Sequence, residues 1–131
     1  MKKIAIYCFV PDVNFKWDEN NYNTGKIGSS EIWAIKLSEE FVKRGYEVYV
    51  FGNPNIEHKS ENGVLYFYTS SFKGVCEQTS FDYVILSRTL NPLNDIKNCD
   101  NINHCCLFCI VKYIFKCIYS IFPCIFFYTF I

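Results

Sequence analysis

The residues best suited to chemistry lie in a short segment rich in glycine and serine, residues 24–31, which reads TGKIGSSE. Glycine lets backbone amides approach a ligand closely, and the free amides and dipole at a helix N-terminus attract anions. Since an amphipathic pattern follows, the segment predicts either a phosphate or diphosphate site or an ordinary helix start. In the second alternative a Ser hydroxyl caps the helix and Glu31 interacts with the helix dipole. The candidate binding residues in this segment are Gly25, Gly28, Ser29, Ser30 and Glu31.

The spacing of these glycines disfavours two common nucleotide-binding loops. A P-loop requires Gly-Lys followed by Ser or Thr at the helix start, whereas Gly25-Lys26 is followed here by Ile27. A dinucleotide-binding loop directly follows the first strand, and an acidic residue ends the second strand. Here the first predicted strand ends near Val10, far before the glycines, and the second ends in Phe-Gly-Asn. We therefore expect neither NAD nor any other cofactor.

Four short runs rich in β-branched and aromatic residues predict buried strands. These runs are residues 3–10, 46–51, 64–69 and 81–87. The first is apolar without alternation, which is typical of a strand covered on both faces, as in a parallel sheet. Residues 12–26 and 91–103 are polar and rich in Asn, and they predict loops.

One amphipathic helix is predicted between the first two strands. Trp33, Leu37 and Phe41 recur at helical spacing and form a stripe that faces a core. Basic residues lie in its last turn, and Gly45 provides a glycine C-cap. A strand–helix–strand unit of this length implies parallel strands and a right-handed connection. The fold class is therefore α/β, with a Rossmann-like parallel sheet and flanking helices.

Three further residues could take part in binding. Arg88 follows the last predicted strand, at the edge where α/β sheets bind ligands, and is either a binding cation or an exposed loop residue. His58 lies in a predicted loop and His104 precedes an apolar run, and both are interpreted as incidental. The cysteines that follow His104 crowd into one segment, whereas structural zinc sites usually combine two separated ligand pairs. No metal is therefore expected.

Charge and cysteine content disfavour several classes of protein. The 131 residues include 13 basic and 13 acidic residues, so no nucleic-acid partner is expected, because such proteins need a clustered basic excess. The N-terminal apolar run is short and lacks a cleavage site, which predicts a cytoplasmic location. Five of the eight cysteines lie in residues 105–131. This distribution is unlike a disulfide framework, and reduced thiols are expected.

An apolar, cysteine-rich tail, residues 99–131, follows a predicted domain of residues 1–98. Beyond position 100 its only charged residues are Lys112 and Lys116. The tail is long enough to span a bilayer, although the two lysines would be costly there. Three interpretations are open: a membrane anchor, a buried helix and strand of the domain, or an out-of-frame extension never selected to fold. The abrupt loss of acidic residues favours the third.

Three segments in register resemble the start of family 4 glycosyltransferases, the large retaining group with the two-domain GT-B fold. They are residues 3–7 (KIAIY), 25–31 (GKIGSSE) and 41–51 (FVKRGYEVYVF). Residues 63–64 (GV) and 81–85 (FDYVI) also fit, and the resemblance covers roughly residues 2–94. It implies half of a GT-B fold, with Gly28 as the glycine that approaches the donor diphosphate. Ser29 departs from the second glycine of the family, and Glu31 matches the family glutamate.

The resemblance also implies a function. Such enzymes transfer a hexose from a nucleotide-sugar donor, which is a substrate rather than a cofactor, to a carbohydrate or lipid-linked acceptor. They use a second Rossmann-like domain with a basic pair and spaced glutamates, for which 131 residues leave no room. The expectation is a truncated glycosyltransferase, inactive alone, with no assigned catalytic residue. The alternatives are a non-catalytic α/β binding module anchored to a membrane through residues 105–131, and a different Rossmann-like binding protein.

Overall fold

The computed structural model describes residues 1–89, 91–92, 95 and 102–108. The strands are β1 (Lys3–Cys8), β2 (Glu47–Gly52), β3 (His58–Lys59), β4 (Leu65–Tyr68), β5 (Phe81–Ser87) and β6 (Ile102–Phe108). The helices are α1 (Ser29–Lys43) and α2 (Phe72–Gln78), with short 3₁₀ helices η1 (Glu19–Asn21) and η2 (Thr69–Ser71).

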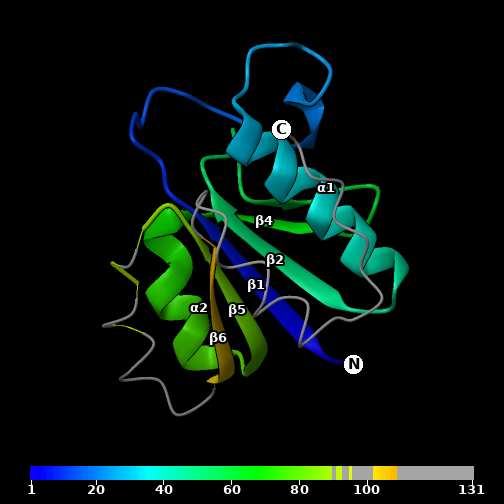
Figure 1. Ribbon diagram of the computed structural model, residues 1–131, viewed down its shortest axis with the longest axis vertical. Coiled ribbons are helices and arrows are strands. Elements are labelled where there is room, and N and C mark those ends of the chain that lie inside the picture. Colours follow the sequence, from blue (N-terminus) through cyan, green and yellow to red (C-terminus); the bar gives the residue numbers. More distant parts are fainter. Residues whose placement is uncertain (90, 93–94, 96–101, 109–131) are drawn as a thin grey trace.

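The strands form one sheet in the order β3-β4-β2-β1-β5-β6. Every neighbouring pair is parallel except β3 and β4, which are antiparallel. β1 therefore lies inside the sheet, with β2 on one side and β5 on the other (Figure 1). The predicted α/β class with a parallel, Rossmann-like sheet is confirmed for the described residues.

Alternate side chains of β1 point into two separate cores. Ile4 and Ile6 pack in one cluster with Phe41 of α1, whereas Ala5 packs in another with Phe72 of α2. Because successive strand residues point to opposite faces, α1 and α2 cover opposite faces of the sheet (Figure 1). The α2 side is rich in aromatic rings: those of Phe51 and Phe72 meet edge to face, whereas the ring of Phe67 stacks on those of Tyr49 and Phe51.

The C-terminus of α1 agrees with the sequence pattern. Arg44 is the C-cap, and Gly45 follows with a φ of 90°. The Gly45 amide donates to the Val42 carbonyl at 3.0 Å, and the Tyr46 amide donates to the Phe41 carbonyl at 3.1 Å. These bonds form a Schellman motif. The rings of Phe41 and Tyr46 meet edge to face, 5.8 Å apart, and complete the apolar contact that accompanies this motif.

The N-terminus of α1 differs from the expectation. Gly28 is the N-cap and no side chain caps the helix, so the predicted capping by a Ser hydroxyl is wrong. Glu31 does lie in the first turn. The predicted apolar stripe is confirmed, since Leu37 and Phe41 are buried and the half-buried Trp33 packs against the same core.

Besides the two 3₁₀ helices, two strands and one α-helix were not predicted. His58, expected in a loop, forms β3 with Lys59, and the short α2 lies in a stretch without a predicted helix. β6 pairs with β5 from Phe81↔Ile102 to Ser87↔Phe108. It covers the end of the predicted loop and the start of the apolar run. These seven residues therefore agree with the interpretation of that part as a strand of the domain.

The rest of the apolar tail, residues 109–131, lies outside the described residues, so its three interpretations stay predictions. Within the described part of the chain, no helix is both long enough and apolar enough to cross a membrane.

Candidate functional site

The direction of the strand order reverses at β1. From β1 the chain proceeds to β2 and β4 on one side, and later to β5 and β6 on the other. Ligands of open α/β sheets bind outside the carboxyl ends of the strands at such a point. Cys8 and Ser87, the last residues of β1 and β5, are paired in register, and the Phe9 amide donates to the Ser87 carbonyl at 3.3 Å. The candidate site lies at this edge, which we call the β1/β5 edge.

An ion pair between a buried carboxylate and an exposed guanidinium joins α1 to the β1/β5 edge. Glu31 Oε1 lies 3.9 Å from Arg88 Nη1, and the Glu31 side chain is only 6% exposed against 34% for Arg88. Glu31 lies in the first turn of α1, where the helix dipole favours an anion. Arg88 has a φ of 67°, which is uncommon for a residue other than glycine. The structure thus brings together two residues predicted for binding from distant parts of the sequence.

The two predicted glycines have different roles. A Cβ on Gly28 would lie 2.7 Å from Glu31 Oε2, although the φ of Gly28 is an ordinary −79°. The close approach at Gly28 is therefore made by the protein's own carboxylate. Gly25 has a φ of 68° and open space around its Cβ position, so its lack of a side chain allows a turn.

The N-terminus of α1 has backbone amides without a partner inside the helix. The amides of residues 29–31 have no partner within the helix, because the Ile32 amide is the first to bond back, to the Gly28 carbonyl at 3.1 Å. Ser30 is buried, but Gly28 and Ser29 are exposed. An anion can therefore reach this helix end from solvent.

Cys8 and Ser87, the last residues of β1 and β5, are both buried at the β1/β5 edge. Burial raises the pKa of the Cys8 thiol to about 12, the Glu31 carboxylate adds to this rise, and Arg88 opposes it. The thiol is therefore protonated at neutral pH and is not an activated nucleophile.

The Ser87 hydroxyl is unusual in its surroundings. It is buried and makes no hydrogen bond of normal geometry to a described residue, although it lies close enough to lower the pKa of Cys8 slightly. Buried polar groups normally find a partner in the protein, in water or in a ligand.

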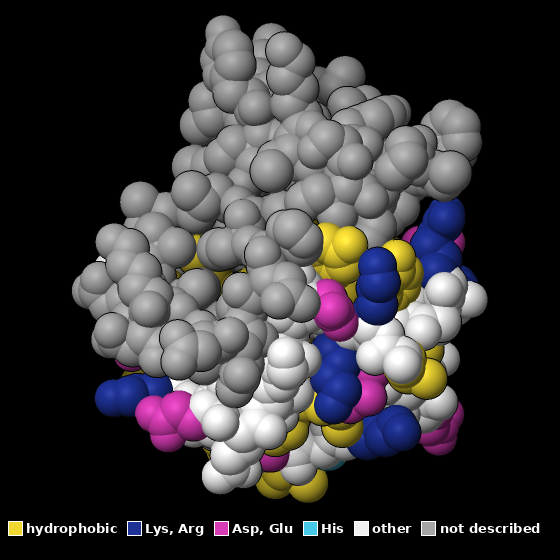
Figure 2. Space-filling model, turned by 90° about the horizontal axis from the view of Figure 1, so that it is seen from below, with side chains coloured by type: hydrophobic (Ala, Val, Ile, Leu, Met, Phe, Trp, Pro, Cys, Tyr) yellow, Lys and Arg dark blue, Asp and Glu magenta, His cyan; other side chains and the backbone are white. Residues whose placement is uncertain are grey.

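Among the described residues on the face shown in Figure 2, neither the basic nor the acidic side chains gather into one large patch. Basic and acidic side chains are interspersed there, in agreement with a formal net charge of zero. Because the formal net charge is zero, recognition of an anion at the β1/β5 edge would depend on local groups rather than on long-range attraction.

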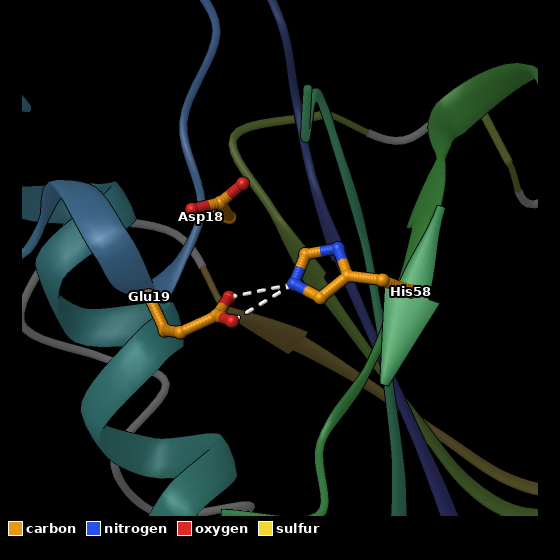
Figure 3. A group of neighbouring side chains, drawn as sticks. All are labelled: Asp18, Glu19 and His58. Atoms are coloured by element: carbon orange, nitrogen blue, oxygen red, sulfur yellow. Dashed lines mark hydrogen bonds and ion pairs between the residues drawn. The ribbon is translucent and has the colours of Figure 1, made fainter. Parts of the chain in front are cut away.

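A second cluster of ionisable side chains lies beside β3. Asp18, Glu19 and His58 place one ligand atom each within 4.8 Å of one another (Figure 3). The sequence pattern gave no sign of this cluster, because His58 follows β2 whereas the two acids precede α1. Only the pairing of β3 with β4 places the histidine opposite them.

No family model matches this chain, and no curated protein or solved structure shows significant similarity to it. The resemblance to family 4 glycosyltransferases therefore rests on sequence segments alone. The geometry of the β1/β5 edge is the structural basis for a function.

Proposed function

We propose that the β1/β5 edge binds the diphosphate of a nucleotide-sugar, and that the chain is part of a glycosyltransferase acting on a carbohydrate or lipid-linked acceptor. The observation that carries this proposal is the Glu31–Arg88 ion pair beside the open first turn of α1. It supplies a cation and free amides at the one place where the strand order reverses.

Arg88 suits an exchange of anionic partners. Its side chain is 34% exposed, whereas that of Glu31 is nearly buried, so a phosphate approaching from solvent reaches the guanidinium first. Arginine binds phosphate in a bidentate manner. The amides of residues 29–31 would hold the second phosphate, at the exposed end of the helix.

The same groups suit the chemistry of sugar transfer. When the bond between sugar and diphosphate breaks, negative charge grows on the leaving diphosphate. A fixed helix dipole and a guanidinium stabilise that charge more in the transition state than in the ground state. By the family resemblance, the nucleotide and the remaining catalytic groups would be held by a second domain, so this edge would supply one side of the cleft.

Titration of the full chain with UDP, GDP and UDP-glucose, followed by calorimetry, tests the proposal. Arg88→Gln should weaken binding about tenfold, the loss expected for one charge-assisted contact of ~1.5 kcal/mol. Arg44→Gln is the matched control, because Arg44 pairs with Glu40 on the exposed side of α1. In the unaltered protein, the amide resonances of Ser29 and Ser30 should shift on binding.

Two results would count against the proposal. Absence of binding to the folded chain would refute a diphosphate site, and equal affinity in Arg88→Gln would place the ligand elsewhere.

A further inference from the structure

We infer that Asp18, Glu19 and His58 form a binding site for one divalent transition-metal ion, a role separate from the β1/β5 edge. The three residues come from the loop before α1 and from β3, and Figure 3 shows their side chains converging. Their ligand atoms all lie within 4.8 Å of one another. In a tetrahedral site with bonds of about 2.0 Å, ligand atoms are roughly 3.3 Å apart, so small movements would enclose an ion.

The hydrogen bonds of His58 show which ring nitrogen faces the Glu19 carboxylate and would bind a metal ion. Nδ1 lies 2.8 Å from the carbonyl oxygen of Ile56. A carbonyl only accepts, so Nδ1 carries the proton and donates it. Nε2 is then directed at Glu19, 2.8 Å from Oε1 and 3.0 Å from Oε2. Carboxylate oxygens also only accept, so at this distance Nε2 donates a proton to Glu19, and a bound metal ion would replace that proton.

Metal-binding histidines usually have this second-shell arrangement. The ring nitrogen that does not bind the metal donates to a backbone carbonyl or carboxylate, which fixes the tautomer and ring orientation. The ring of Tyr66 also stacks on that of His58, with centroids 5.2 Å apart and planes 11° from parallel. The imidazole of His58 is therefore held in a ligand geometry by groups that would not themselves touch the ion.

Asp18 is positioned before any ion binds. It is 2% exposed, and one carboxylate oxygen accepts from the Asn20 amide at 3.0 Å, as the cap of η1. The Asp18 amide donates to the Asn21 side chain in return. Its neighbour Trp17 donates from the backbone to the Asn53 carbonyl at 2.9 Å. The loop is thus fixed to the end of β2, and metal binding would order little further chain.

The charge and type of the ligands select the class of ion. With the imidazole neutral, as metal binding requires, the two carboxylates give the ligand set a formal charge of −2, which one divalent cation neutralises. Imidazole and carboxylate ligands suit Zn²⁺, Co²⁺ and Mn²⁺, whereas soft ions prefer thiolates. Three protein ligands leave a fourth position for water or a substrate.

Titration of the full chain with Co²⁺, after removal of bound metal by a chelator, tests this site. We expect one equivalent to bind with visible d–d absorption. A thiolate-to-cobalt charge-transfer band in its place would assign the ion to cysteine and overturn the proposal. His58→Gln and Glu19→Gln should each weaken binding at least about tenfold, because loss of even a second-shell partner costs roughly 10- to 100-fold in metal affinity. Glu77→Gln, an exposed carboxylate on α2, should leave it unchanged.

Circular dichroism would show whether each variant is folded. If a variant unfolds, the unaltered protein decides, because Zn²⁺ should shift the nitrogen resonance of His58 Nε2 and leave Nδ1 protonated. No visible absorption with Co²⁺ in the unaltered chain would overturn the proposal. Unchanged Co²⁺ affinity in folded His58→Gln would do so as well.

Discussion

The indole of Trp17 packs directly on the backbone of Gly52, the last residue of β2. A Cβ at residue 52 would overlap the ring, with the indole atom Cε2 only 3.0 Å away. Trp17 is 1% exposed and belongs to the core on the α1 face. This contact fixes the loop that carries Asp18 and Glu19 against the sheet. Residue 52 must be glycine because a larger side chain would overlap the indole ring.

Gly52→Ala should therefore destabilise the protein by about 1–3 kcal/mol, as overpacking of a dense core does. Urea unfolding followed by circular dichroism measures the loss. Gly74→Ala is the control, because no atom lies within 4 Å of the Cβ position of Gly74 in α2. There, alanine should stabilise the helix by about 0.5–1 kcal/mol. Equal stability in the two variants would contradict the packing described for Trp17.

Gly45→Ala should destabilise the protein for a different reason. The Gly45 φ of 90° lies in the left-handed region, which costs a residue with a Cβ about 1–2 kcal/mol, while no atom lies within 4 Å of its Cβ position. Because the strain is conformational, Gly45→Asn should lose less than Gly45→Ala, since Asn tolerates this region better. Thermal unfolding of both variants would separate these values, and equal losses would argue against a conformational cause.

Glu31→Gln should increase the affinity of the β1/β5 edge for UDP. The Glu31 carboxylate competes with a phosphate for Arg88, at 3.9 Å from its guanidinium. Removal of a like charge worth about 1 kcal/mol raises affinity roughly fivefold. Glu40→Gln is the control, because Glu40 pairs with Arg44 in the last turns of α1. Calorimetry that shows weaker UDP binding in Glu31→Gln would mean that Glu31 contacts the ligand itself.

Cys8 should confer a pH-dependent part of the stability. Its thiol has an ordinary pKa of 9.0, which is raised to about 12 in the fold. The stabilisation that comes from the raised pKa of Cys8 is complete below pH 9, because the thiol is then protonated in the folded and the unfolded state. It is lost as the pH rises to about 12, where the thiol of the folded protein ionises. The stability difference between the unaltered protein and Cys8→Ala should shrink across this window in urea titrations.

A simpler measurement addresses the same thiol at pH 8. Iodoacetamide should modify Cys8 far more slowly in the native protein than in guanidinium, as judged by mass spectrometry of the Cys8 peptide. Rapid modification of the native protein would show that the thiol is neither buried nor protonated.

The elements that the sequence pattern predicts correctly are those with strong local signals. α1 has an apolar stripe, basic residues in its last turn and Gly45, and each of these features acts within a few residues. β1 and β2 are continuous apolar runs between turn residues. α2 has only seven residues and contains Gly74, and β3 has two. Elements this short are stabilised by tertiary packing rather than by propensity.

The candidate sites were predicted less completely because they depend on distant contacts. Glu31 and Arg88 were each singled out by their position, but their ion pair requires β5 to lie beside β1. The capping expectation for Ser29 or Ser30 was wrong because Gly28 takes the cap position. His58 was interpreted as incidental because no local pattern indicates that a two-residue strand will place it opposite Glu19.

The position of β1 inside the sheet also affects how the chain folds during synthesis. β1 leaves the ribosome before both of its neighbours, and one of them, β5, is complete only at Ser87. At about 5–20 residues per second, translation exposes one open edge of β1 for a few seconds after β2 has emerged. Open strand edges pair readily with other chains. Nascent chains of this protein are therefore most exposed to misassembly on the ribosome before β5 appears.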